Sequence, residues 1–314
     1  MNITSFVKST VFLQNVTAIT MESWLIPMDI LMIILTTLVI TISCVFLIII
    51  ILNKTCHTVI MMLIANTYLS ALLFGCCLLG SSVFMFQNDV KQIQDQDSLC
   101  NFRGYFIYVS CGLHNYSFLL QAIYRYLTAV YPNRLFWQSR RIQILFICIK
   151  WIFCFVYILP ILFTNGFTYN VDNQIYQTPL ALSFSIIYAS TCVYAFPMLL
   201  IVLIYFTLVR NVHGMSKRVT AANTLSRAKR ELKMVRRIVI LVGILLTIGF
   251  PYVLFAVISF FTTPPKHHYR IAYIFAETSL VCVLITSYYF TDPLKTSIIK
   301  IINRQQNRVI QAVI

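Results

Sequence analysis

Seven long apolar blocks dominate this chain of 314 residues and leave few folds open to it. Each block has about 20 residues or more, and a helix of that length, at about 1.5 Å per residue, crosses a hydrocarbon core of about 30 Å. The alternating ten-residue segments of a membrane barrel are absent. Because lipid offers the backbone no hydrogen-bond partners, we predict an all-α membrane protein, a seven-transmembrane helix bundle. Its spans are residues 25–52, 58–86, 104–128, 142–163, 180–209, 237–263 and 269–294.

The composition agrees with a single membrane domain. Hydrophobic residues make up 59% of the chain and charged residues only 11%, too little charge to cover the surface of a soluble protein of this size. We find no repeats or low-complexity segments. We expect a short extracellular tail over residues 1–24, the bundle over 25–294, and an amphipathic eighth helix with a short cytoplasmic tail over 295–314.

The placement of positive charge predicts the orientation. Of the 24 Lys and Arg residues, 18 lie in one alternating set of connections and in the C-terminal tail. Connections rich in Lys and Arg stay in the cytoplasm, so we expect a multi-pass protein of the plasma membrane with its N-terminus outside. The sequons that begin at Asn2 and Asn15 agree with this orientation, because glycosylation needs an outer location.

The net charge of +15 does not indicate nucleic acid. The basic residues lie where membrane topology already requires them, so their expected neighbours are membrane lipids and a cytoplasmic partner. No cysteine pair has metal-ligand spacing, and the neighbouring His267 and His268 lack a third ligand. We therefore expect no nucleic acid, no metal and no cofactor.

The third block combines apolar residues with polar ones at helical spacing. Six positions separated by alternating steps of four and three form one stripe along a helix, and polar side chains on it should face the interior of the bundle, away from lipid. For the histidine alone, we expect a buried side chain with satisfied hydrogen bonds. The stripe consists of Ile107, Cys111, His114, Phe118, Gln121 and Arg125.

Landmarks on five separate spans follow one another in a familiar order. In the third block, Cys100 precedes Arg125 by 25 residues, and Tyr131-Pro132 follows. Together these landmarks resemble the rhodopsin-like (class A) G-protein-coupled receptors over nearly the whole chain. The others are Trp151 with Pro160, Pro197 with Tyr205, Pro251, and Asp292-Pro293 followed by the basic segment LKTSIIKIINR, which is similar to the family's membrane-lying eighth helix.

The resemblance implies a receptor that binds an extracellular ligand and activates a heterotrimeric G protein. Arg125 matches the arginine of the family's Asp-Arg-Tyr motif, although Tyr124 replaces the acid. Glu231, placed 20 residues before Pro251, matches the acid that often pairs with this arginine, so we hypothesise an Arg125–Glu231 bridge that holds the closed state. The residues expected in activation and coupling are Arg125, Tyr126, Tyr205, Glu231, Pro251, Asp292 and Pro293.

Several positions depart from the family pattern. Residues 163–191 contain no cysteine, so we expect Cys100 to be unpaired and no disulfide at the outer loop. Ala71 or Ser70 stands where the family has an acid that binds sodium. Gly249 replaces a large tryptophan, and Phe250 is a candidate to take over its packing. Asp292 and Thr296 replace an asparagine and a tyrosine of the seventh helix, which leaves open whether activation is rewired.

The ligand is constrained more by exclusion than by a motif. Ile107 occupies the place of the aspartate of amine receptors, and Thr286 that of the retinal lysine. A peptide or a small apolar, chemosensory molecule remains. Glu277 can bind a cationic peptide group, but a solvated helix end is the favoured interpretation. The expected pocket is mostly apolar and comprises Ile107, Cys111, Tyr252, Ala256, Thr278 and Cys282.

Two other functions stay open. A membrane transporter is one, although inverted repeats and paired broken helices are not evident. Lys150, which falls within the fourth span, is the feature left unexplained: either its side chain reaches towards the membrane surface or the span begins later than residue 142. A non-signalling, receptor-like membrane protein is the other. We expect no enzyme, because motifs such as H-E-x-x-H, G-x-S-x-G and the P-loop are absent.

Overall fold

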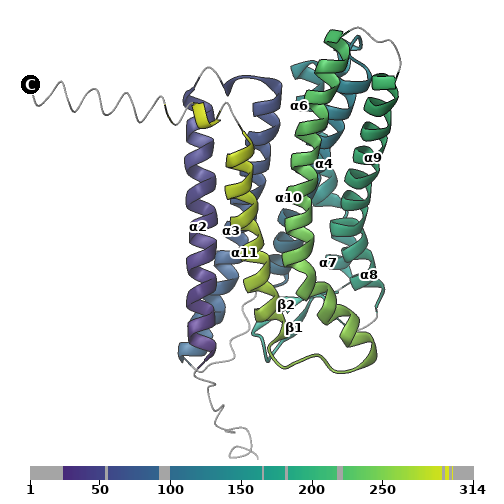
Figure 1. Ribbon diagram of the computed structural model, residues 1–314. Coiled ribbons are helices and arrows are strands. Elements are labelled where there is room, and N and C mark those ends of the chain that lie inside the picture. The colour runs from purple at the N-terminus through teal and green to yellow at the C-terminus, as the bar shows by residue number, and fades with distance from the viewer. Residues whose placement is uncertain are drawn as a thin grey trace, which may run out of the picture.

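The computed structural model describes residues 24–53, 56–91, 100–164, 166–180, 183–217, 222–291, 294–296 and 299. In this part of the chain, long helices lie side by side, and one short antiparallel hairpin joins two of them (Figure 1). The elements are α2 (Leu25–Leu52), α3 (Val59–Lys91), α4 (Cys100–Val130), α5 (Leu135–Gln138), α6 (Arg140–Val156), α7 (Leu159–Phe163), β1 (Thr168–Asn170), β2 (Ile175–Gln177), α8 (Phe184–Ser190), η2 (Thr191–Ala195), α9 (Phe196–Lys217), α10 (Ala222–Phe261) and α11 (His268–Phe290).

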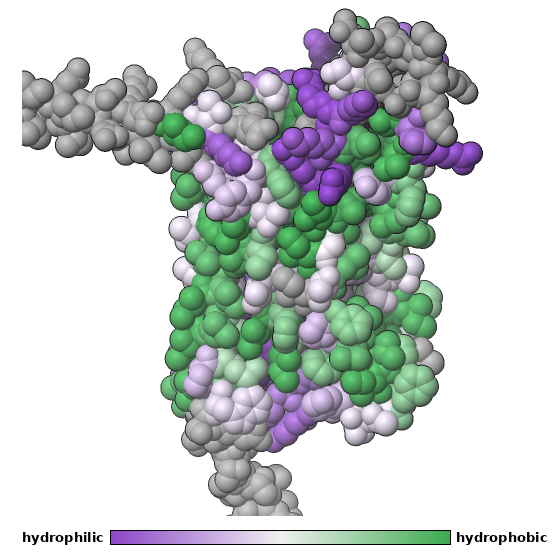
Figure 2. Space-filling model, viewed as in Figure 1, coloured by the Kyte–Doolittle hydropathy of each residue, from purple (hydrophilic) through white to green (hydrophobic). Residues whose placement is uncertain are grey.

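The two ends of the bundle differ. At the hairpin end lie β1, β2 and the first residues of α4 and α11, at the bottom of Figure 1. Tyr176 of β2 lies beside the start of α4, because a Cβ on Gly104 would approach its carbonyl oxygen to 3.2 Å. At the opposite end, called the basic end, the first turns of α10 expose Lys229, Arg230 and Lys233. Figure 2 shows an apolar band between the two ends, with hydrophilic residues gathered over the basic end.

The described helices confirm a membrane-spanning bundle. Five helical stretches are long and apolar enough to cross a membrane: Leu25–Leu52, Val59–Lys91, Arg140–Phe163, Phe184–Gly214 and His268–Phe290. The sixth is a bent pair within α10, Val235–Ile244 and Gly249–Phe261, which meet at 51°. A bend there is expected, because Pro251 donates no backbone hydrogen bond to the preceding turn.

Helix α4 is not among these apolar stretches. It lies inside the bundle, in contact with α3, α6, α9 and α10. Its polar stripe faces the interior as predicted, since Ile107, His114, Phe118, Gln121 and Arg125 are all buried. A helix surrounded by other helices needs no continuous apolar surface. Hydropathy alone therefore does not identify α4 as a membrane-spanning helix.

Helix α10 begins much earlier than its apolar block. The predicted span started at residue 237, whereas the helix starts at Ala222. The additional turns carry exposed basic side chains, including Arg236. Hydropathy detects only the portion that lies in lipid, while good helix formers such as Ala, Leu, Lys and Arg extend the helix into water.

Candidate functional site

A cavity of about 450 Å³ lies among the helices on the side of the hairpin end. Residues of α3, α4, β2, α8, η2, α9, α10 and α11 line it, and its wall is mostly apolar. Of the six residues predicted for a ligand pocket, Ile107, Cys111 and Tyr252 line this cavity. The other three, Ala256, Thr278 and Cys282, are not among its lining residues.

A hydrogen-bonded network closes the cavity at the hairpin end. We call it the tyrosine network; its members, Tyr108, Gln177, Tyr252 and Tyr273, all line the cavity. The hydroxyl of Tyr108 donates to Oε1 of Gln177 at 2.9 Å and lies 3.3 Å from the hydroxyl of Tyr252. Nε2 of Gln177 donates to the hydroxyl of Tyr273. These polar groups are therefore engaged with one another across α4, β2, α10 and α11.

Two other polar side chains in the cavity wall are not engaged in this way. Oγ of Ser279 is buried without a hydrogen-bond partner among the described residues, and neither ring nitrogen of His114 makes a hydrogen bond of full geometry there, although the backbone of Thr67 interacts with the imidazole. The expectation of a satisfied histidine is therefore met only in part. The imidazole also stands edge to face with the ring of Phe118, with centroids 5.0 Å apart.

Asn115, the neighbour of His114, has a structural partner. Because Pro197 lacks an N–H, the carbonyl of Val193 four residues earlier has no donor from its own helix. Nδ2 of Asn115 donates to this carbonyl at 2.9 Å, and the hydroxyl of Tyr116 donates to the carbonyl of Cys192 at 2.9 Å. Two side chains of α4 thereby satisfy the backbone of the wide turn η2 beside the proline.

Gly249 accommodates a tyrosine from another helix. A Cβ at this position would lie 2.8 Å from the hydroxyl of Tyr194, and both residues line the cavity. Tyr194 of η2 therefore occupies the space beside Gly249. Phe250, which we proposed for that packing role, is 55% exposed, so that expectation is wrong: the residue faces away from the bundle.

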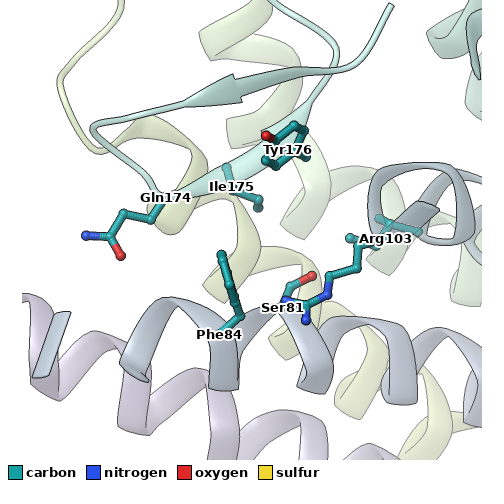
Figure 3. A pocket seen from close by; sticks show the side chains of 7 residues that line it. Ser81, Phe84, Arg103, Gln174, Ile175 and Tyr176 are labelled. Carbon is teal, nitrogen blue, oxygen red and sulfur yellow. The ribbon is translucent and has the colours of Figure 1, made fainter. Parts of the chain in front are cut away.

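A second, much smaller hollow lies beneath the hairpin (Figure 3). Ser81 and Phe84 of α3, Gln174 and Tyr176 of the hairpin, and Arg103 of α4 surround it. The guanidinium carbon of Arg103 lies 4.5 Å from the centre of the Phe84 ring, a cation–π contact. Ile107 lines both spaces, so a positive charge borders the hollow but not the main cavity.

An ion-pair cluster joins three helices near the hairpin end. Nη1 of Arg270 on α11 lies 2.9 Å from Oδ1 of Asp29 on α2 and 2.5 Å from Oδ2 of Asp89 on α3. All three side chains are buried. Glu277, two turns further along the same face of α11, is also fully buried and accepts a hydrogen bond from Ser82 at 3.5 Å. The expectation of a solvated Glu277 is therefore wrong.

Lys150 of α6 points into the bundle. Its Nζ donates to Oγ of Ser117 at 2.9 Å, to Oδ1 of Asn66 at 3.2 Å, and to Ser70 and the carbonyl of Leu113 at 3.4 Å. The residue is buried, so the prediction that it reaches towards the membrane surface is wrong. Four neutral oxygens of α3 and α4 surround its ammonium group instead.

At the basic end, α4, α9 and α10 pack through an apolar cluster, which we call the basic-end cluster. Its buried members are Ala129, Leu208, Val212 and Val235, with Tyr126 and Tyr205 packed against them. Arg125 is buried one turn from Ala129. Nη1 of Arg237 on α10 also donates to the carbonyl of Phe290 on α11 at 2.5 Å. The basic end is thus held together by contacts between these helices.

Several predicted features lie outside the described residues. These are the sequons at Asn2 and Asn15, Asp292, Pro293 and most of the proposed eighth helix. The side chains of Cys100 and Glu231 are also not described, although both belong to described helices, α4 and α10. The unpaired state of Cys100 and the Arg125–Glu231 bridge therefore stay predictions.

The bundle, its internal cavity and its closed basic end define the class of multi-pass, seven-helix membrane receptors. A family model described as "7 transmembrane receptor (rhodopsin family)" matches residues 43–289, and the chain belongs to this family, which consists of receptors and not of enzymes. Among solved structures, squid rhodopsin matches with a TM-score of 0.68 and 16% identity, over 87% of this chain and 83% of that one. No curated protein matches by sequence.

Proposed function

We propose that this protein is a G-protein-coupled receptor of the plasma membrane, with the hairpin end and the N-terminus outside the cell. A small apolar ligand occupies the main cavity and favours a state in which the inner ends of the helices separate and admit a heterotrimeric G protein. A mostly apolar cavity of this size favours such a ligand over a peptide.

One observation carries the proposal: the same two helices form both the cavity and the closed basic end. Helix α4 contributes Cys111 to the cavity and Ala129 to the basic-end cluster. Helix α10 contributes Tyr252 to the cavity and Val235 to the cluster. A ligand that shifts α10 relative to α4 therefore acts on both ends, and the bend between them lets the inner segment swing.

Arg125 is the residue we expect the G protein to contact. It lies on α4 beside the basic-end cluster, so separation of α10 from α4 uncovers it. Tyr205, packed against the same cluster from α9, is placed to fill the space that α10 leaves. Tyr126, the residue after Arg125, packs against the same cluster, and Pro251 supplies the bend of α10.

The test is guanine-nucleotide exchange on purified heterotrimeric G proteins of each main class, with the receptor reconstituted in nanodiscs. We expect the wild type to accelerate exchange on at least one class, and Arg125→Ala to abolish most of this acceleration. Lys91→Ala is the matched control, because Lys91 is an exposed basic residue at the hairpin end, away from the face that we propose to bind the G protein. No acceleration on any class, or equal loss in both variants, would overturn the proposal.

A further inference from the structure

The wall of the main cavity carries no charged side chain among the residues that the structure describes. Its lining consists of aliphatic, aromatic and neutral polar residues from eight elements. A ligand amine or carboxylate inside it would lose its hydration without gaining an opposite charge, at a cost of several kcal/mol or more. The cavity therefore selects uncharged molecules, or molecules whose charged group stays outside it.

The polar atoms of the cavity fall into two layers. The first layer, nearer the hairpin end, is the tyrosine network, in which Tyr108 and Tyr273 are both hydrogen-bonded to Gln177. The second layer lies further along the helices, towards the middle of the bundle. His114 is six residues beyond Tyr108 on α4, and Ser279 is six residues beyond Tyr273 on α11. Both helices start at the hairpin end, so each of these residues lies about 9 Å further from that end than the network does.

The second layer is the one with unused hydrogen-bonding capacity. His114 is 1% exposed and Ser279 is 2% exposed, yet Oγ of Ser279 has no partner in the described part of the chain, and the imidazole of His114 interacts only with the backbone of Thr67, without a hydrogen bond of full geometry at either nitrogen. Buried polar groups without partners are rare and costly, and they mark places where a bound molecule or water completes the bonds. Here both line one cavity, His114 from α4 and Ser279 from α11.

We infer that the main cavity takes an uncharged, largely apolar molecule that carries one hydroxyl or carbonyl group, and that His114 and Ser279 bind this group. The inference rests on the proposed function and adds the chemical class of the ligand and the two residues that recognise it. A neutral imidazole offers one N–H donor and one bare nitrogen, and a serine hydroxyl donates and accepts. Together the two side chains thus offer both a donor and an acceptor to a ligand hydroxyl or carbonyl.

The Lys150 ammonium strengthens this choice of ligand. Its Nζ donates to the carbonyl of Leu113, the residue before His114. A positive charge therefore already lies close to the part of α4 that lines the cavity. A cationic ligand group at His114 would be repelled by it. An anionic group has no direct access to it, because Asn66, Ser70 and Ser117 enclose the ammonium.

The experiment uses matched ligand sets and the purified receptor without any G protein. Each set contains a rigid hydrocarbon of roughly ten to twenty carbons, sizes suited to a cavity of this class, together with its alcohol, ketone, carboxylate and primary amine. Dissociation constants are measured in nanodiscs, and Ala189→Phe, which fills the cavity wall at a fully buried position, corrects for partition into lipid. Ala276→Phe is the second filling variant if the first does not fold.

We expect the alcohol or ketone of at least one set to bind more tightly than its hydrocarbon, carboxylate and amine. His114→Phe and Ser279→Ala should each weaken this neutral polar member by about tenfold, the contribution of one buried hydrogen bond, while leaving the hydrocarbon unchanged. His114→Asn, which keeps a hydrogen-bonding group, should restore part of the loss. Thr286→Ala, a hydroxyl deletion on α11 outside the cavity, should have no effect.

The inference is overturned if no neutral member binds, if a charged member binds most tightly, or if the advantage of the oxygen persists in both variants; the last result would mean that His114 and Ser279 hold only water. Because binding is measured without a G protein, these failures are distinct from failure of the proposed function, which would appear as absent nucleotide exchange by a receptor that binds its ligand normally.

Discussion

Two regions of this receptor bury charge inside a membrane, and they compensate it differently. Near the hairpin end, Arg270 lies between Asp29 and Asp89, so each charge faces an opposite one. Midway along α6, Lys150 faces only the neutral oxygens of Asn66, Ser70, Ser117 and the backbone. The first region is an ion-pair cluster, and the second is a cation that is hydrogen-bonded only to neutral groups.

The difference teaches what each region contributes. Removing Arg270 from the ion-pair cluster leaves two carboxylates in low dielectric without a cation, which is strongly destabilising. Removing Lys150 leaves no charge, and its acceptors still bond to one another: Asn66 donates to Ser117 at 3.1 Å, Ser70 lies 3.0 Å from Ser117, and Trp151 donates to Asn66 at 3.0 Å. The cluster should therefore hold α2, α3 and α11 together, whereas Lys150 should be dispensable for stability.

Arg270→Met should have the largest effect on stability. It leaves Asp29 and Asp89 side by side without a cation, and we expect a loss of about 3–5 kcal/mol in the free energy of unfolding. The measurement is the melting temperature of purified protein, followed by tryptophan fluorescence. Arg134→Met, which removes an exposed arginine, serves as the control. A loss no greater than that of the control would show that the ion pairs contribute nothing to the fold.

The two acids should be unequal. Asp89 receives two hydrogen bonds from Arg270, at 2.5 and 3.2 Å, and Asp29 receives one, at 2.9 Å, while its Oδ2 finds no partner in the described chain. Asp89→Asn should therefore destabilise by about 1–3 kcal/mol, and Asp29→Asn by about 1 kcal/mol or less. Comparison of the two melting temperatures checks this order, and the reverse order would place the main ion pair on α2.

Lys150→Met should have the smallest effect, within about 1 kcal/mol of the wild type, because a side chain of similar length replaces the ammonium and its acceptors keep other partners. The same melting experiment applies. A loss comparable with that of Arg270→Met would contradict the comparison and would show that the ammonium itself ties α6 to α3 and α4.

The fold was readable from the sequence, because length and hydropathy fix membrane helices. The inward stripe of α4 also followed from spacing alone, since lipid leaves polar residues such as Gln121 no other direction; its Nε2 indeed donates to Thr67 at 2.6 Å. The beginning of α10 was missed by fifteen residues, because the helix leaves the membrane before it ends.

The site was less predictable, because its contacts join residues far apart in the chain. No local pattern pairs Arg270 with Asp29, 241 positions away, or assigns Tyr194 to the space beside Gly249. Lys150 did give a signal, as an ionisable residue within an apolar span, but its direction depends on two partner helices, α3 and α4. Half of the predicted pocket residues line the cavity. Helical spacing correctly predicts which face of α4 is buried, whereas the faces that α10 and α11 turn towards the cavity depend on how these helices pack.

The most direct test of the account is the separation of the inner ends of α4 and α10. Spin labels carried by non-canonical amino acids at the exposed positions Tyr131 and Ser226 report this distance by pulsed electron resonance in nanodiscs. With a nucleotide-free G protein, the account predicts a shift of the distance distribution to longer values, and Arg125→Ala should prevent it. A distribution that stays the same with every class of G protein would contradict the claim that opening of this face transmits the ligand's effect.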